Sequence, residues 1–259
     1  MKIPEGLKVI RIDIDPTEMF RLRPAVGIVA DAKLGARALA DALSREIAKR
    51  ASREEEFIGI KARTLEEIRS VQPQMAYLEV IRDVLPRDGF FVEEICQAGF
   101  TSRFGFPVYQ PRTFVTGGYQ DNVGFGFMTA LGVKVANPDK AVVSIAGDGG
   151  FMFGVQELAT AVHHGINLVT IVFNNNSYGN VLRDQRNVFK GREIGALLTN
   201  PDFVKLAENF GAAGYLAKTP AELKPALEKA LALERPVIIE VPLERGSETS
   251  PWKFLHPNA

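Results

Sequence analysis

Residues 141–181, AVVSIAGDGGFMFGVQELATAVHHGINLVTIVFNNNSYGNV, decide the fold that the sequence predicts. Residues 141–146 form a short apolar run that ends at a glycine, as is typical of a buried parallel strand. Apolar residues then follow helical spacing over residues 155–162, and Gly165 ends the helix. A second apolar run, residues 168–173, is followed by three asparagines. The pattern predicts a βαβ unit with a right-handed crossover.

Both strands of this unit run in the same direction, so the residues after them meet at the carboxyl edge of the sheet, where open parallel sheets bind ligands. Asp148 offers a carboxylate there, Asn175 offers an amide oxygen, and the chain near Ser177 offers backbone carbonyls. Hard oxygen ligands suit Mg²⁺ or Ca²⁺, and Mg²⁺ with few protein ligands usually also holds phosphate oxygens. Gly149 and Gly150 let backbone N–H groups approach an anion. We therefore predict a site for a metal ion with a phosphate or diphosphate.

The spacing of these residues resembles a known signature. Gly-Asp-Gly, a spacer of 24 residues and Asn-Asn resemble the diphosphate-binding motif of thiamine diphosphate enzymes of the acetolactate synthase/2-oxoacid decarboxylase family. The resemblance implies that Asp148, Asn175 and the backbone carbonyl of Ser177 bind Mg²⁺. It implies further cofactor contacts at Gly147, Gly149, Gly150, Asn175, Tyr178, Gly179 and Asn180. The alternative is a βαβ unit whose Asp and Asn residues merely occupy turns.

Two other segments resemble the same family. Cys96-Gln97-Ala98 stands where the family has a Gly-Gln-His turn at the diphosphate, so Gln97 matches and the family histidine is absent. Residues 113–132 resemble a glycine-rich loop with a hydrophobic residue that props the cofactor in its bent form, and Val123 is the matching position. A glycine-rich turn before a buried helix is the alternative. Cys96 has no histidine nearby in the sequence, so we expect a small core residue and not a nucleophile.

The opening of the chain is too small to hold a core of its own. It combines a strand at residues 8–14 with a helix that Asp31 can cap, and it resembles the closing strand and helix of the middle domain in the same family. A small extension packed on the main domain is the alternative. The resemblance divides the chain into a remnant of a middle domain (1–48), an exposed linker (49–70), a thiamine diphosphate-binding domain (71–247) and a tail (248–259).

The fold expected for the main domain is an α/β doubly wound parallel sheet with helices on both faces. Further elements are predicted as a helix that carries Met75, Leu78 and Ile81, a strand at 89–95, a helix at 201–210, a helix from the capping box at Thr219 to about residue 234, and a last strand at 236–241.

Composition limits the other possibilities. The chain has 259 residues with 31 basic and 31 acidic side chains, which gives no electrostatic footprint for nucleic acid or an anionic membrane. The single cysteine excludes a disulfide framework. The sequence contains no apolar run as long as a membrane span, and charges stand where a signal peptide needs an apolar core. A cytoplasmic protein is the expectation.

The resemblance implies an activity that this chain performs only in part. The family's cofactor adds to a 2-oxo acid, which then loses CO₂, and a glutamate from another domain activates the aminopyrimidine. We see no counterpart of that glutamate, so no catalytic residue is assigned in this chain. An amino-terminal pyrimidine-binding domain or chain is the expected partner, in a homodimer or homotetramer.

Three other functions remain open at this point: a non-catalytic thiamine diphosphate-binding module, a subunit of a 2-oxoacid:ferredoxin oxidoreductase, and an unrelated nucleotide-binding α/β protein. The single cysteine argues against the oxidoreductase subunit, since such subunits usually carry iron–sulfur cysteines. We expect Arg183, Asp184 and Arg186 to be solvated and His163 and His164 to be cap and surface residues. Residues 250–257 are expected to become ordered when cofactor and substrate bind.

Overall fold

The computed structural model describes residues 3–256, so residues 257–259 of the expected tail lie outside it. The described part of the chain divides into two compact units. The first unit ends at Lys61 and the second begins at Ala62.

The first unit is built on two short parallel strands, β1 (Ile10–Asp13) and β2 (Val26–Val29). A 3₁₀ turn (Pro16–Glu18) and α1 (Met19–Leu22) connect them, and α2 (Ala32–Glu46) follows. The Asp31 carboxylate accepts the N–H groups of Lys33 and Leu34, as a helix cap should. Gly35 alone is buried among the residues whose burial is described in this unit. The unit therefore has no apolar core within its described residues.

The expected linker is helical over most of its length. Helix α3 (Glu54–Ile68) begins with three glutamates in its first turn, where the helix dipole favours negative charge. The helix contains five glutamates and one each of Lys, Ala, Arg and Leu, all residues of high helix propensity, so the charge-rich sequence here encodes a helix. Ile68 is the one buried residue of this helix.

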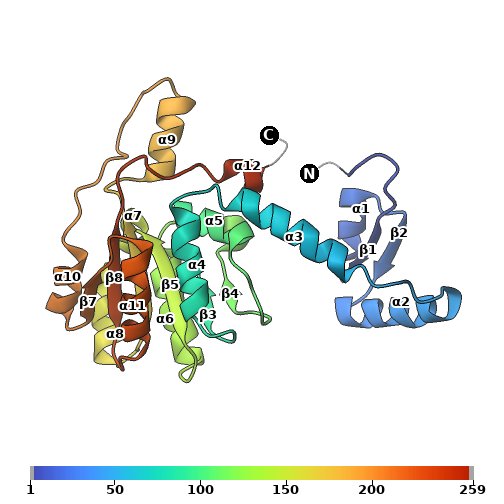
Figure 1. Ribbon diagram of the computed structural model, residues 1–259, viewed down its shortest axis with the longest axis horizontal. Coiled ribbons are helices and arrows are strands. Elements are labelled where there is room, and N and C mark those ends of the chain that lie inside the picture. The colour runs from blue at the N-terminus through green and yellow to red at the C-terminus, as the bar shows by residue number, and fades with distance from the viewer. Residues whose placement is uncertain (1–2, 257–259) are drawn as a thin grey trace. The chain divides into compact units, whose positions relative to one another are not determined.

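The second unit is organised around one six-stranded sheet in which all pairs are parallel (Figure 1). The strands are β3 (Phe90–Val92), β4 (Phe114–Val115), β5 (Val142–Gly147), β6 (Val169–Asn174), β7 (Ala213–Leu216) and β8 (Val237–Pro242). Their order is β4-β3-β5-β6-β8-β7, so the two strands of the predicted βαβ unit lie at the centre. The predicted α/β class is confirmed.

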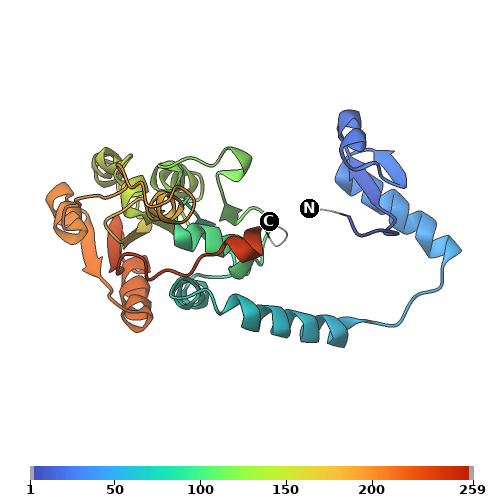
Figure 2. The ribbon, with the colours of Figure 1, turned by 90° about the horizontal axis from the view of Figure 1, so that it is seen from above.

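Helices cover both faces of this sheet, as Figures 1 and 2 show. On one face lie α4 (Gln74–Val84), α5 (Gln97–Gly105) and α11 (Pro220–Leu231). On the other lie α6 (Phe125–Ala136), α7 (Asp148–Phe151), α8 (Leu158–His163) and α10 (Phe203–Phe210). The α7 and α8 helices, with a 3₁₀ turn at Val155–Glu157, form the crossover between β5 and β6.

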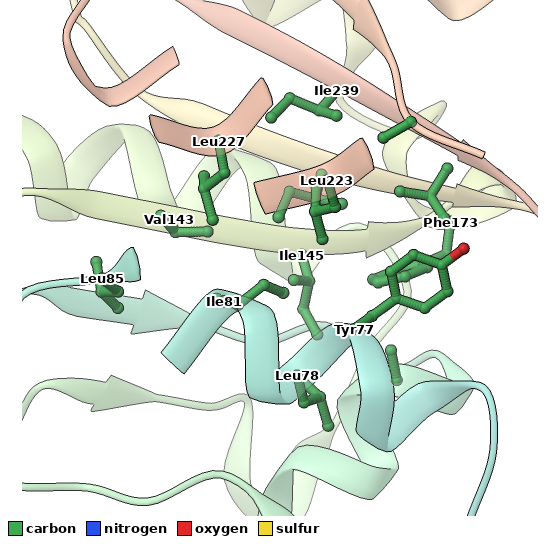
Figure 3. Packing of buried hydrophobic residues seen from close by; sticks show 14 of the residues in the cluster. Tyr77, Leu78, Ile81, Leu85, Val143, Ile145, Phe173, Leu223, Leu227 and Ile239 are labelled. Carbon is green, nitrogen blue, oxygen red and sulfur yellow. The ribbon is translucent and has the colours of Figure 1, made fainter. Parts of the chain in front are cut away.

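The core follows from strand periodicity. Val143 and Ile145 of β5 belong to the cluster shared with α4 and α11, whereas Val142 and Ala146 belong to the cluster on the opposite face. Figure 3 shows the first cluster, in which Ile81 of α4 lies among side chains of β5 and α11. Both faces of the central strands are apolar, as expected of a parallel sheet covered on both sides.

Several elements differ from the prediction. The strands β2, β4 and β7 span only two to four residues, too few for a periodic pattern, and were not predicted. Neither were α9 (Gly179–Asn187) and α12 (Trp252–Leu255). The predicted strand at 89–95 is only Phe90–Val92; the N–H of Glu93 still donates to Val115 of β4, after which the chain turns into α5. Residues 96–98, expected to form a turn, begin α5 with Cys96 as its N-cap.

The central position of Ile145 gives a test of the fold. Its side chain is fully buried, so Ile145→Ala should lower the free energy of unfolding by about 3 kcal/mol through lost transfer energy and a cavity. Val135→Ala is the control, since Val135 of α6 is 62% exposed and should change stability by less than about 0.5 kcal/mol. Urea unfolding followed by circular dichroism measures both, and equal losses would contradict this core assignment.

Candidate functional site

The residues predicted to bind cofactor and metal meet in one cleft at the carboxyl edge of β5 and β6. The cleft is lined by every one of them: Gln97, Val123, Gly147, Asp148, Gly149, Gly150, Asn175, Ser177, Tyr178, Gly179 and Asn180. Ile95, Cys96, Phe100, Phe173, Val181 and Glu248 complete the lining. The parallel fold thus brings together residues that are up to 83 positions apart, as between Gln97 and Asn180.

Asp148 begins α7 directly after β5 and is 3% exposed. One carboxylate oxygen accepts the N–H of Gly149 at 2.9 Å. The other accepts the N–H of Ser177 at 3.2 Å and the side-chain amide of Asn200 at 2.7 Å. Burial raises the pKa of this carboxyl above its ordinary value, and the hydrogen bonds oppose the shift. Asp148 is therefore a fixed, buried oxygen donor at the floor of the cleft.

Asn175 lies opposite Asp148, after β6. Its Nδ2 donates to the Glu248 carboxylate at 2.7 Å, and its Oδ1 accepts the hydroxyl of Ser177 at 2.8 Å. Burial raises the pKa of the Glu248 carboxyl, while the bond from Asn175 lowers it. Because Glu248 engages the amide nitrogen, the orientation of the Asn175 side chain is defined.

Gln97 and Asn180 belong to a hydrogen-bonded group at the mouth of the cleft. Arg183 of α9 donates to the side-chain oxygen of Gln97 at 2.8 Å and to the backbone carbonyl of Glu248 at 3.0 Å. Asn180 Oδ1 accepts the indole N–H of Trp252 at 3.1 Å. Arg183 is half-buried, so the expectation that it is solvated is wrong. The cause is its position on the side of α9 that faces the cleft.

The described part of the tail packs on α5. Trp252 of α12 packs on Phe100 of α5, with ring centroids 5.1 Å apart, and Phe254 packs on Phe104 at 5.0 Å. The N–H of Thr249 donates to the backbone carbonyl of Gln72. These contacts place residues 252–254 on α5, and the ordering of residues 250–257 when cofactor and substrate bind stays a prediction; Pro257 lies outside the described residues.

The glycines of the cleft allow close approach of the backbone. A Cβ atom on Gly149 would lie 2.4 Å from the Tyr178 ring, and one on Gly150 would lie 1.7 Å from a carboxylate oxygen of Glu94. Gly124 has a φ of +92°, which favours glycine, and it directly follows Val123, which is 39% exposed. The turn after Asp148 is thus packed between Tyr178 and Glu94.

Two acidic residues after β3 were not singled out from the sequence. Glu94 is 1% exposed, and its carboxylate accepts the N–H groups of Gly124 and Gly126 at 2.7 and 3.1 Å. Burial, the largest cause, raises the pKa of Glu94 to about 7. Glu93 is also fully buried and instead accepts from Arg103 at 2.9 Å. Nothing in the local pattern separates this pair from exposed acids, so only the fold reveals them.

The remaining candidates have structural roles. Cys96 accepts the N–H of Gly99 with its sulfur, and burial raises the pKa of its thiol well above the ordinary value, which disfavours the nucleophilic thiolate. His163 and His164 are exposed at the end of α8, as expected. Within residues 3–256, no three His, Cys, Asp or Glu side chains gather in a way that could hold a metal ion. A cation here would need ligands beyond these residue types.

The fold and the cleft together define an α/β domain with a glycine-lined site, partly apolar and partly polar, at the carboxyl edge of its sheet. Residues 95–241 match the family model described as "Thiamine pyrophosphate enzyme, C-terminal TPP binding domain". Since this match covers more than half of the chain, the chain belongs to that family, whose members form the carboxy-terminal, thiamine pyrophosphate-binding part of such enzymes.

Similar proteins extend the match over nearly the whole chain. An acetolactate synthase large subunit from Haemophilus influenzae is 32% identical over 95% of this chain and 45% of its own length. A 2-hydroxyacyl-CoA lyase from Arabidopsis thaliana is 28% identical over 99% of this chain and 48% of its own. A solved thiamine diphosphate-dependent 4-hydroxybenzoylformate decarboxylase from Rhodococcus jostii RHA1 covers 93% of this chain and 45% of its own, with a TM-score of 0.72 and 23% identity.

The fraction of each relative that this chain covers limits what the similarity shows. The chain spans about half the length of the curated relatives that it matches. The decarboxylase, at its low identity, shows the fold alone.

Among the described residues, none of the helices has the length and apolar character that a membrane crossing requires.

The raised pKa of Glu94 predicts a pH-dependent stability. Between its ordinary value of 4.5 and about 7 the native state binds more protons than the unfolded chain, so stability falls as pH rises through this window. Glu94→Gln removes this titration. From about pH 5 to about pH 8 the variant should gain up to about 3 kcal/mol of unfolding free energy relative to the wild type. Urea unfolding across pH measures the difference, with the exposed Glu208→Gln as control; a constant difference would contradict the raised pKa.

Proposed function

We propose that the cleft binds Mg²⁺ together with the diphosphate of thiamine diphosphate. The observation that carries this proposal is the single cleft lined by Asp148, Asn175 and Ser177 beside the glycine turn. These residues offer carboxylate, amide and carbonyl oxygens, the donor type that Mg²⁺ prefers. Because these donors include few charged ligands, phosphate and water oxygens would complete the coordination, as is usual for Mg²⁺.

Different residues of the cleft would bind the cation, the diphosphate and the rest of the cofactor. Asp148, Asn175 and the carbonyl of Ser177 would hold the cation, and the N–H groups of the turn after Asp148 would face the phosphate. Val123, exposed beside this turn, would support the bent cofactor. When bound, thiamine diphosphate supplies the carbanion chemistry that decarboxylates 2-oxo acids. The protein contributes binding, orientation and the apolar walls formed by Ile95 and Phe173.

We propose that the complete enzyme acts on a small 2-oxo acid by acetolactate synthase-like decarboxylation and carboligation. The similarity to acetolactate synthase large subunits over nearly the whole chain supports this substrate class. The relatives are about twice as long, which supports an amino-terminal pyrimidine-binding domain or chain as partner. The proposed assembly is a homodimer or homotetramer. That partner would supply the glutamate that activates the aminopyrimidine.

The first unit fits the same proposal as a remnant of a middle domain. Apolar side chains are exposed on β2, after β1 and on α2, including Val29 at 55%, Ile14 at 73% and Leu34 at 65%. An isolated pair of strands is at best marginally stable, so these side chains need further elements to cover them. In this proposal residues 1–48 complete a middle domain, residues 49–70 link it to the cofactor domain at 71–247, and residues 248–259 form the tail.

Removal of Asp148 tests the metal assignment. Asp148→Ala should weaken Mg²⁺-dependent binding of thiamine diphosphate by more than about 100-fold, because the one carboxylate proposed to touch the ion is lost. Loss of a residue that only supports a metal ligand costs roughly 10–100-fold in metal affinity. Asn175→Ala should weaken it less. Asp139→Ala is the matched control, since this exposed aspartate precedes β5 at the opposite edge of the sheet. Calorimetry with and without Mg²⁺ measures each affinity, and wild-type affinity of the Asp148 variant would refute the site.

The need for a partner gives a second test. The 259-residue chain alone should release no CO₂ from pyruvate or other 2-oxo acids, because the acid–base group for the aminopyrimidine is supplied elsewhere. Addition of the amino-terminal half of the enzyme should restore cofactor-dependent release. Release by this chain alone would mean that the acid–base group lies in these residues, with Glu248 of the cleft as the first candidate. Calorimetry with ATP and Mg²⁺ separates a nucleotide-binding protein from this proposal.

A further inference from the structure

Glu94 lies beneath the cleft and not in it. It follows β3, is 1% exposed, and its side chain does not line the cleft that the described residues form. A carboxylate that does not line the cleft has no direct access to a ligand. Its role therefore depends on the backbone groups that its carboxylate binds.

Those groups belong to the segment that carries Val123. Gly124 is the N-cap of α6 and has no side chain with which to cap the helix. The Glu94 carboxylate accepts the N–H of Gly124 with Oε1 at 2.7 Å and the N–H of Gly126 with Oε2 at 3.1 Å. The first N–H groups of a helix have no partner within it, so a distant carboxylate here supplies the missing cap.

The other side of the same carboxylate lies against the glycine turn after Asp148. A Cβ atom on Gly150 would come within 1.7 Å of Glu94 Oε1, so the carboxylate occupies the place that a side chain at Gly150 would take. One buried acid thus contacts both parts of the cleft: the segment with Val123 and the turn at Gly149 and Gly150.

We propose that Glu94 is a positioning residue whose carboxylate fixes the segment Val123–Gly126 relative to the turn at Gly149 and Gly150. Its effect on turnover rests on the function proposed above, whereas its effect on the backbone does not. In the enzyme, the position of Val123 against the cofactor would depend on this carboxylate, so the loss would appear in the reacting geometry more than in cation binding.

The charges around Glu94 allow control by pH. Burial raises its pKa to about 7, the two N–H groups lower it, and the neighbouring carboxylates of Glu93 and Asp121 raise it further. Arg103 pairs with both of those carboxylates, and the nearby Cys96 is half-buried. When Glu94 is protonated, one of its oxygens becomes an O–H donor. The N–H groups of Gly124 and Gly126 are donors themselves and cannot accept a hydrogen bond from it. The two N–H groups lower the pKa of Glu94, so they bond its carboxylate more strongly than its acid form. While Glu94 stays buried, acidification should therefore loosen the segment, although protonation of this buried group stabilises the native state against global unfolding.

Amide hydrogen exchange on the full chain without cofactor tests the positioning role directly. At about pH 8, exchange of the Gly124 and Gly126 amides should be at least ~10-fold faster in Glu94→Gln than in wild type, after correction for intrinsic rates. The amide of Ile145 at the centre of the sheet is the internal reference. Glu93→Gln is the matched control, because this equally buried neighbour binds Arg103 and Thr116 and not the segment.

The wild type supplies a measurement that needs no variant. Protection of the Gly124 and Gly126 amides relative to Ile145 should decrease as pH falls from about 8 to about 5.5, and should not vary in Glu94→Gln. Unchanged protection in the variant, or pH-independent protection in the wild type, would overturn the proposal. If the variant does not fold, the wild-type profile alone decides.

The complete enzyme with cofactor and Mg²⁺ tests the consequence. Glu94→Gln should lower kcat by about 10-fold or more and remove the acidic limb of its pH profile, with Mg²⁺ and cofactor affinities within about 3-fold of wild type. A merely structural loss would lower affinity and kcat together and leave the profile in place, which would refute the positioning role. If the exchange results hold but the wild type binds no thiamine diphosphate, the proposed function fails and the positioning role stands.

Discussion

The parallel pairing of β5 with β6 is the constraint on which the site depends. Its register places Gly147 beside Phe173, so the chain leaves both strands at the same level of the sheet. Asp148 and Asn174 therefore emerge side by side, and the N–H of Ser177 reaches the Asp148 carboxylate at 3.2 Å. An antiparallel pair would place the two turns at opposite edges. The apolar strands that fix this pairing are thus the physical cause of the cleft.

Buried polar groups turn that edge into a rigid platform. The Glu240 carboxylate on β8 accepts the amide of Asn174 at 2.7 Å and the backbone N–H of Phe203 at 3.2 Å. Asn174 in turn accepts from Asn200 at 2.9 Å, and Asn200 also donates to Asp148 at 2.7 Å. Each side chain in this network forms a hydrogen bond with the next. The network favours a single arrangement of these side chains, because breaking any of the bonds leaves a polar group without a partner. The position of Asp148 is therefore set from β8 and α10 as well as from its own strand.

The sequence predicted the parts of the molecule that local pattern encodes. The apolar runs of β5, β6 and β8 and the cap at Thr219 predicted the central elements, and the motif predicted residues that share one cleft. The edge strands were missed, since the sequence of β7, AGYL, is stabilised by pairing with β8 and not by its own composition. Glu94 was missed because its partners, two backbone N–H groups, lie 30 and 32 residues away. Long-range contacts of this kind leave no periodic signal.

The hydrogen bonds within the cleft also determine which atoms remain for a ligand. The amide nitrogen of Asn175 donates to Glu248, so the amide oxygen faces Ser177. This oxygen accepts the hydroxyl of Ser177 with one lone pair and keeps a second lone pair for a ligand. Gln97 accepts from Arg183 at 2.8 Å, whereas its own nitrogen donates to Asn180 only over a long 3.4 Å contact. In both side chains one end is fixed by protein and the other keeps bonding capacity. The ligands proposed for this cleft are a cation, which needs oxygen, and a phosphate, which needs donors; the protein's own contacts would orient Asn175 and Gln97 for both.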